Sequence, residues 1–183
     1  MGQNDYERAS EMNRAGGECL EKGDFHGALE NFSRALELLP DDQAEPKARL
    51  HNNRGHIQIQ LKRYDDALSS FGKAAEIYDT LGNPIGLGDQ LGNIGSVHRD
   101  REEWDAALEH YSKSLAVFEK AGHTRGVADQ YSNIAYAHSR QARFKSAFEF
   151  FRKAKALYDE VGEQMKSQLC DQNMQALTPY IEK

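Results

Sequence analysis

The chain has 183 residues, of which 28% are charged and 39% are hydrophobic, and its formal net charge is −6 at pH 7. These proportions are ordinary for a water-soluble protein, and the negative charge argues against nucleic-acid binding, which requires a basic surface. No apolar run is long enough to span a membrane, and the first eight residues are too polar for a secretory signal, so we expect a cytoplasmic protein.

Helices are predicted in pairs from one end of the chain to the other. Pro40 ends the first pair, and Gly82, Gly122 and Gly162, spaced by 40 residues, end the next three as left-handed caps. Residues 41–47 form the only linker-like stretch. The first helices of the pairs are expected near 5–22, 45–61, 85–101 and 125–141, the second helices near 26–39, 66–81, 105–121 and 145–161, and one more helix after Gly162.

The second helices share a spacing pattern. A small residue is followed four positions later by an aromatic residue and three positions after that by another small residue, and the pattern recurs every 39 or 40 residues. Self-similarity at this period predicts a tandem array in which each helix pair stacks on its neighbours to bury its apolar face. The four copies are Ala28-Phe32-Ala35, Ala67-Phe71-Ala74, Ala107-Tyr111-Ser114 and Ala147-Phe151-Ala154.

Two further positions, one small and one aromatic, precede each copy of this pattern at fixed spacing. A small residue lies twelve positions before the leading alanine and lets two helix backbones approach closely, while an aromatic residue three positions before it fills the wedge between helix pairs. The small residues are Gly16, Gly55, Gly95 and Ala135, and the aromatic residues are Phe25, Tyr64, Trp104 and Phe144.

Together these positions resemble the tetratricopeptide repeat. Units two to four are similar to the 40-residue variety found in kinesin light chains, Leu-Gly-Asn repeat proteins and bacterial peptide-sensing regulators. Arg54 and Ser114 depart from the pattern, as do the residues in the slot usually held by tyrosine, namely Cys19, Gln58, His98 and His138. The best-fitting unit is the first, which has Gly16, Gly23, Phe25, Ala28, Phe32, Ala35 and Pro40 in place.

The resemblance implies an all-α fold, a right-handed α-solenoid of antiparallel helix pairs that forms a single domain over residues 1–183. The helix after Gly162, near 163–177, is expected to cap the array, with Met165, Leu169, Met174 and Leu177 covering the last pair. The four repeat units are expected near 9–42, 48–82, 88–122 and 128–162.

The most informative polar residues are Asn53, Asn93 and Asn133, at the sixth position of units two to four; Asn173 continues the series. In the resembled fold the first helix of each unit lines a concave groove, so equivalent positions there form a ladder. An asparagine amide complements a peptide unit because it has both donors and an acceptor. The ladder therefore predicts a groove for a peptide backbone, and bonding between neighbouring helices remains the alternative.

Other first-helix positions are also expected to face the groove. Small residues there leave room for a ligand backbone, and Leu20, Ile59 and Tyr136 accept its side chains. The predicted partner-binding residues are Asn13, Arg49, Asn52, Asn53, His56, Asp89, Asn93, Arg99, Asp129, Asn133 and Tyr136, with Ser10, Gly17, Gly92, Ser96, Ser132 and Ser139 beside them. The cationic clamp by which heat-shock co-chaperones hold a terminal carboxylate is absent.

No other motif predicts chemistry. The sequence shows no phosphate-binding loop, zinc spacing or nucleophile with a placed base, so we expect no enzyme activity, no cofactor and no metal. Periodic aromatics at Tyr78, Phe118 and Tyr158 are expected in the core, and His98 and His138 are expected to pack between helices. Cys19 and Cys170 belong to opposite ends of the array and are expected to stay as thiols.

These features predict a protein-interaction module that binds an extended peptide or partner segment in its concave groove, as a monomer or weak homo-oligomer without nucleic-acid or membrane partners. Two alternatives remain open. One is a structural scaffold that packs against copies of itself, and the other is the regulatory repeat array of a larger signalling protein.

Overall fold

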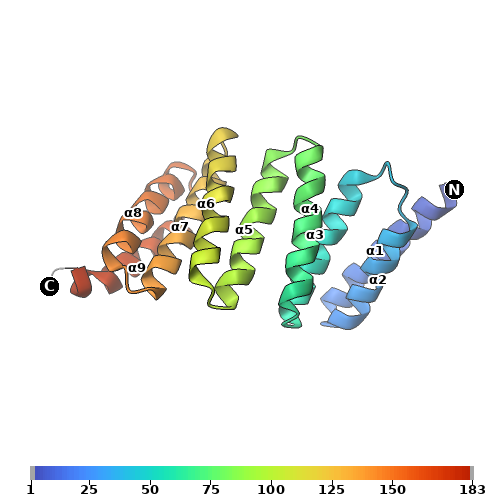
Figure 1. Ribbon diagram of the computed structural model, residues 1–183, viewed down its shortest axis with the longest axis horizontal. Coiled ribbons are helices and arrows are strands. Elements are labelled where there is room, and N and C mark those ends of the chain that lie inside the picture. The colour runs from blue at the N-terminus through green and yellow to red at the C-terminus, as the bar shows by residue number, and fades with distance from the viewer. Residues whose placement is uncertain (1–2, 182–183) are drawn as a thin grey trace. The chain divides into compact units, whose positions relative to one another are not determined.

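A computed structural model describes residues 3–181, with side chains from residue 5 onward, and the regular structure in that range is entirely α-helical (Figure 1). Every predicted helix is present, with its ends shifted by a few residues, and the all-α arrangement of helix pairs is confirmed. The described helices are α1 (Gln3–Glu21), α2 (Phe25–Leu38), α3 (Ala44–Gln60), α4 (Tyr64–Thr80), α5 (Pro84–Asp100), α6 (Trp104–Lys120), α7 (Thr124–Arg140), α8 (Phe144–Glu160) and α9 (Gln164–Ile181).

The turns that follow the second helices are formed as predicted. Gly82, Gly122 and Gly162 adopt φ angles of 63°, 66° and 75°, in the left-handed region that glycine enters without steric cost. The amide three residues beyond each helix end then donates back to the helix, as in Asn83 N to Tyr78 O at 2.9 Å. These bonds satisfy carbonyls that a helix terminus otherwise leaves free.

The turns within three of the helix pairs use the same left-handed conformation without glycine. Lys62, Glu102 and Ala142 have φ angles of 57°, 59° and 56°, and no pattern in the sequence predicted this. The next amide in each turn closes a bond to the preceding helix; for example, Arg63 N donates to Gln58 O at 2.7 Å. That bond compensates for part of the cost of placing a residue with a Cβ in this region.

The predicted linker over residues 41–47 is shorter than expected, because α3 already begins at Ala44. Pro46 lies in the first turn of this helix, where its missing N–H would have had no intrahelical partner. Proline therefore allowed the helix to start earlier than the sequence suggested. The irregular stretch is confined to residues 39–43.

The chain falls into two compact units, one containing α1 to α4 and the other, from Pro84 onward, containing α5 to α9. Within each unit consecutive helices lie side by side (Figure 1). The aromatic residues of the second-helix pattern are buried against the small residues of the first helices: a Cβ added to Gly16 would lie 2.5 Å from the Phe32 ring, and one added to Gly55 would lie 2.5 Å from the Phe71 ring. Close helix approach at these glycines is confirmed.

Tyr78, Phe118 and Tyr158 are all buried, which confirms their assignment to the core. None of the described helices is long and apolar enough to cross a lipid bilayer.

The buried face of the capping helix α9 agrees only in part with the prediction: Leu177 is buried and Met174 packs against the same core, as expected. The helix buries Ser167, Cys170 and Leu177, whereas Met165 is 84% exposed and Leu169 is 53% exposed. The expectation that Met165 and Leu169 cover the last pair is therefore wrong. The buried stripe of α9 follows helical spacing from Ser167 through Cys170 to Leu177, and Met165 and Leu169 lie outside it. The prediction chose residues by hydrophobicity alone and therefore overlooked a serine and a cysteine.

Candidate functional site

The first hollow on the first-helix side of the molecule lies in the N-terminal unit, between α1 and α3; we call it the α1–α3 hollow. It has a volume of about 330 Å³. The structure brings four of the residues expected in the groove together here, namely Ser10, Asn13, Arg49 and Asn53. Its other lining residues are Tyr6, Ala9, Leu39, Glu45, Pro46 and Leu50.

Polar and apolar groups share the α1–α3 hollow. The buried side chains of Leu39 and Leu50 form its apolar part, while the exposed Arg49 supplies a guanidinium for which no salt bridge is seen in the described part of the chain. Asn53 accepts a long hydrogen bond of 3.5 Å from Asn52 in the same helix. The hollow can therefore accept an apolar side chain together with an acceptor or anionic group.

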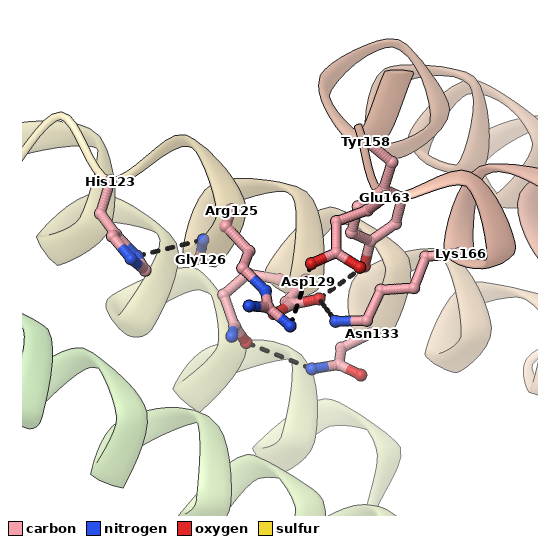
Figure 2. Close-up of polar contacts among 9 residues, drawn as sticks. His123, Arg125, Gly126, Asp129, Asn133, Tyr158, Glu163 and Lys166 are labelled. Atoms are coloured by element: carbon pink, nitrogen blue, oxygen red, sulfur yellow. Dashed lines mark hydrogen bonds and ion pairs between the residues drawn. The ribbon is translucent and has the colours of Figure 1, made fainter. Parts of the chain in front are cut away.

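The second hollow lies in the C-terminal unit, between α5 and α7, and we call it the α5–α7 hollow. It has a volume of about 390 Å³, and Figure 2 shows part of its polar lining. The lining residues are Asp89, Gly92, Asn93 and Ser96 from α5, Asp129, Gln130, Ser132 and Asn133 from α7, Tyr158 from α8, and Lys166 and Leu169 from α9.

Asp129 is the centre of a hydrogen-bonded network in the α5–α7 hollow (Figure 2). Lys166 Nζ contacts its Oδ1 at 2.6 Å, and the Tyr158 hydroxyl donates to the same oxygen at 2.7 Å. Burial, followed by the hydrogen bond to Asp129, raises the pKa of Tyr158 well above its ordinary value. The negative charge of Asp129 is therefore used inside the molecule, where it joins α7 to α8 and α9.

A second ion pair joins α7 to the start of α9. Arg125 Nη2 lies 3.1 Å from Glu163 Oε1, and both side chains appear beside the Asp129 network in Figure 2. At the start of α7, Gly126 N donates to His123 Nδ1 at 3.1 Å. This bond caps the helix that carries Asp129 and Asn133 and fixes the position of its first turn.

Asp89 differs from Asp129 although both occupy the same position in successive repeats. Burial raises the pKa of Asp89, the nearby positive charge of His123 lowers it, and the negative charge of Asp129 raises it further. No salt bridge to Asp89 is seen among residues 5–181. Asp89 is therefore a carboxylate that faces the hollow without an ion pair to a lysine or arginine among the described residues.

A third hollow of about 420 Å³ adjoins the second and shares Ser132, Asn133 and Leu169 with it; we call it the α7–α9 hollow. Tyr136 is exposed along its wall, and Arg99 is held in an ion pair with Asp100 at 2.8 Å. Its lining comprises Arg99, Asp100, Ser132, Asn133, Tyr136, Phe151, Leu169 and Asn173. The first-helix positions of the C-terminal unit thus open onto a continuous hollowed surface.

Nine of the eleven predicted partner-binding residues line one of these hollows, and the other two, Asn52 and His56, lie outside them. His56 packs edge-on against the Phe71 ring, with a centroid distance of 5.2 Å. His56 is nevertheless exposed, so it covers the edge of a core aromatic ring from the surface.

In the α5–α7 hollow, sequence reasoning missed Gln130, Lys166 and Leu169 as lining residues, besides Tyr158, which was expected only in the core. A signal for two of them is present in the sequence: Gln130 is spaced by 40 residues from Gln90, and Leu169 follows Asp89 and Asp129 at the same step. Lys166 offers no such signal, since it enters the hollow only because α9 packs against α8 and brings this side chain to Asp129.

His98 and His138 pack against neighbouring rings. His98 stacks on His110 at 5.3 Å and its Nδ1 contacts Glu103 Oε2 at 2.6 Å, while His138 stacks on Phe150 at 5.5 Å. In the described range no group of three or more histidine, cysteine or acidic side chains is placed to hold a metal ion. Cys19 and Cys170 are both free thiols.

Comparison with known proteins identifies the repeat. Two family models of the tetratricopeptide repeat match residues 48–81 and 90–160. A Schizosaccharomyces pombe protein described as DnaJ homolog subfamily C member 7 homolog is 36% identical over 62 residues, which are 34% of this chain and 13% of that protein.

Three solved structures have the same fold at low sequence identity. The apo form of RapI matches 97% of this chain and 69% of its own length, with a TM-score of 0.81 and 19% identity. Aspartyl phosphate phosphatase F from Bacillus subtilis matches 97% of this chain and 50% of its own length, with the same TM-score and identity. BtubC from P. vanneervenii matches 99% of this chain and 93% of its own length, with a TM-score of 0.67 and 14% identity.

The chain thus spans only half of the phosphatase and a small part of the DnaJ homologue, so these likenesses describe the helical repeat and not the activity of the whole proteins. The repeat marks in the sequence, the helix pairs of the structure and the two family models agree: this chain is a repeat protein of the tetratricopeptide type.

Proposed function

We propose that this chain is a protein-interaction module whose first helices hold an extended segment of a partner protein. The general class is supported by the tetratricopeptide matches, because this repeat serves protein–protein contacts. The finer proposal, a peptide lying along the first-helix face, rests on the geometry of the hollows. The two thiols fit a reducing compartment, so we propose a cytoplasmic partner.

The observation that carries the proposal is the position of the asparagine ladder. Asn53 lines the α1–α3 hollow, Asn93 and Asn133 line the α5–α7 hollow, and Asn173 lines the α7–α9 hollow. All four side chains are half-buried, so each is partly enclosed by protein while remaining accessible from a hollow. An amide in such a position can donate to a peptide carbonyl and accept from a peptide N–H.

The internal contacts of two ladder residues favour a ligand over bonding between helices. Asn53 contacts Asn52 at 3.5 Å, and Asn133 Nδ2 donates to Gln130 Oε1 at 3.4 Å. Both contacts stay within one helix, and both are at the long end of the hydrogen-bond range. The two amides therefore keep capacity for stronger bonds to a group that enters the hollow.

Space for a peptide backbone comes from small residues. Gly92, Ser96 and Ser132 line the α5–α7 hollow, and a Cβ added to Gly92 would lie 3.2 Å from Gln130 Nε2. A larger side chain at Gly92 would therefore crowd the hollow. Tyr136 and Leu169 remain exposed beside it and offer apolar surface to the side chains of the partner.

The test uses the triple variant Asn53→Ala, Asn93→Ala, Asn133→Ala and a peptide selected by the wild-type protein from a random twelve-residue display library. Each lost contact is worth roughly 0.5–1.5 kcal/mol, so affinity should fall on the order of 10-fold to 1000-fold while the free energy of unfolding changes little. Asn31→Ala is the matched control, because Asn31 lies on the second helix α2 and its amide bonds to Gly27 O.

Two measurements on the same variant separate the alternatives. Urea unfolding reports stability, and fluorescence anisotropy with the labelled peptide reports affinity. A large loss of stability with intact affinity in the folded fraction would show that the asparagines bond between helices and would contradict the peptide ladder.

A further inference from the structure

The α5–α7 hollow distinguishes its two aspartates. Asp129 receives Lys166 at 2.6 Å and the Tyr158 hydroxyl at 2.7 Å, so its charge is compensated within the chain. Asp89 lines the same hollow from α5 and remains accessible, yet in the described part of the chain it has no ion pair with lysine or arginine. An uncompensated carboxylate in a concave surface favours a cation from outside.

The groups around Asp89 reinforce this asymmetry. Partial burial disfavours its charged form and raises its pKa, and Asp129 acts in the same direction; only His123 lowers the pKa. A ligand cation beside Asp89 would stabilise its charged form and offset the repulsion between the two carboxylates.

An independent observation points to a ligand with a carbonyl oxygen in the same place. Gln130 lines the hollow and is only 5% exposed. Its Oε1 accepts from Asn133 Nδ2 at 3.4 Å, but its Nε2 has no acceptor among the described residues. Because Gln130 lines the hollow, this donor is placed to bind a carbonyl oxygen of a molecule that enters it.

The position of that amide allows a backbone to reach it. Gln130 and Gly92 both line the hollow, and Nε2 lies 3.2 Å from the position that a Cβ of Gly92 would take, so the missing side chain lets this amide lie directly against α5. A peptide in extended conformation can bring one of its carbonyl oxygens to this point.

We propose that the α5–α7 hollow recognises a basic residue, arginine or lysine, in an extended segment of the partner. Asp89 binds the cationic side chain and Gln130 Nε2 donates to a backbone carbonyl of the segment. The neighbouring α7–α9 hollow, with Leu169, Phe151 and Tyr136, accepts an apolar residue of the same segment. This inference rests on the proposed peptide-binding function and names the chemistry of its ligand.

The experiment is a selection of random twelve-residue peptides displayed on their encoding RNA, carried out separately against the wild-type protein and three variants. Asp89→Asn removes the charge, Asp89→Lys reverses it, and Glu160→Gln is the control for net charge, since Glu160 is exposed on α8 away from the hollows. Circular dichroism and urea unfolding confirm that each variant is folded.

Wild type and Glu160→Gln should enrich peptides that contain arginine or lysine near an apolar residue. Asp89→Asn should lose the basic enrichment, and Asp89→Lys should favour acidic residues in its place. For one selected peptide, Asp89→Asn should weaken binding on the order of 5-fold to 10-fold, and the difference from wild type should shrink as salt is added.

The outcomes separate this inference from the proposed function. If the wild type enriches peptides without a basic preference, or if Asp89→Asn keeps that preference, the basic-residue pocket is wrong while the peptide groove stands. If the wild type enriches no peptide at all, the proposed function itself fails, and the inference fails with it.

A second variant tests the amide. Gln130→Met keeps the length of the side chain but removes the donor, so it should weaken the selected peptide by roughly 2-fold to 10-fold while leaving the basic preference unchanged. Unchanged affinity in a folded Gln130→Met protein would remove Gln130 from the site.

Discussion

The α1–α3 hollow and the α5–α7 hollow share one helical framework but present different chemistry. At the same repeat position the first has Arg49 and the second has Asp89 and Asp129. The buried Leu39 and Leu50 form the apolar part of the first, whereas the second is lined mainly by amides, hydroxyls and carboxylates, with Leu169 as its exposed apolar residue. The comparison shows that the second helices supply the common core, while a few side chains on the first helices determine what each hollow can bind.

The two hollows also differ in how they are held. The α5–α7 hollow is joined to the capping helix through Lys166, Asp129 and Tyr158, and Arg125 adds a second link to Glu163. In the α1–α3 hollow the helix α1 contributes Tyr6, which is largely exposed. The C-terminal hollow should therefore depend on the cap, and the N-terminal hollow should not.

Removing the capping helix should have the largest effect on stability, and it should affect the α5–α7 hollow but not the α1–α3 hollow. A chain that ends at Gly162 loses the buried Cys170 and Leu177 and uncovers Phe151 and Tyr158. The lost burial is worth roughly 3–6 kcal/mol, and the uncovered surface should cause self-association. Thermal unfolding and light scattering measure both effects. An equally stable monomer would contradict the capping role of α9.

Core truncation should instead affect both units alike. Phe71→Ala and Phe151→Ala each remove a buried ring from the second-helix pattern and should each cost about 3–5 kcal/mol in urea unfolding. Lys73→Ala, on the exposed face of α4, is the control and should stay within about 0.5 kcal/mol of wild type. A loss below about 1 kcal/mol for either phenylalanine would show that the two cores are not equivalent.

Acid should destabilise both units through buried histidines. Burial, followed by the charge of Arg54, lowers the pKa of His51 from 6.5 to about 4, and burial also lowers the pKa of His110 and His138. The Nδ1 atoms of all three are buried without a partner in the described residues. The unfolded chain takes up protons near pH 6.5 and the folded chain does not, so stability is present above that pH and is lost as the pH falls from 6.5 towards 4.

His51→Gln tests the contribution of the N-terminal unit. It should remove about 1–3 kcal/mol of the stability difference between pH 7 and pH 4, measured by urea unfolding at each pH. His26→Gln is the control, since His26 is exposed. An identical pH dependence in His51→Gln and wild type would show that His51 does not titrate as the structure indicates.

The smallest effect is expected from the link to the cap. Lys166→Met removes the partially exposed cation beside Asp129 but leaves the Tyr158 bond, so it should lower the free energy of unfolding by about 1 kcal/mol. Arg125→Met, at the more exposed pair with Glu163, should cost less. If Arg125→Met has the greater effect, then Asp129 is not the main connection between α7 and α9.

Periodicity made the fold predictable, because alanines, glycines and aromatics at fixed repeat positions report helix packing directly. The glycine caps at Gly82, Gly122 and Gly162 followed from the same rule, whereas the left-handed Lys62, Glu102 and Ala142 carry no compositional signal. Most of the lining of the α5–α7 hollow was also predictable from first-helix positions, whereas six of the ten lining residues of the α1–α3 hollow were not.

What the sequence did not predict depends on contacts between distant segments. Lys166 reaches Asp129 only because α9 packs against α8, and Met165 is exposed because the buried stripe of α9 passes through Ser167 and Cys170. The open donor of Gln130 appears only when the surroundings of a buried amide are known.

The central claim is that a partner peptide lies along the first helices and contacts the asparagine ladder. The most direct measurement is a titration of the ¹⁵N-labelled protein with a selected peptide, following the side-chain amide signals of Asn53, Asn93 and Asn133 by NMR. Those signals should shift in proportion to the bound fraction, while the amide of Asn31 on α2 stays unchanged. Shifts confined to the second helices, with the three ladder amides unmoved at saturation, would contradict the account.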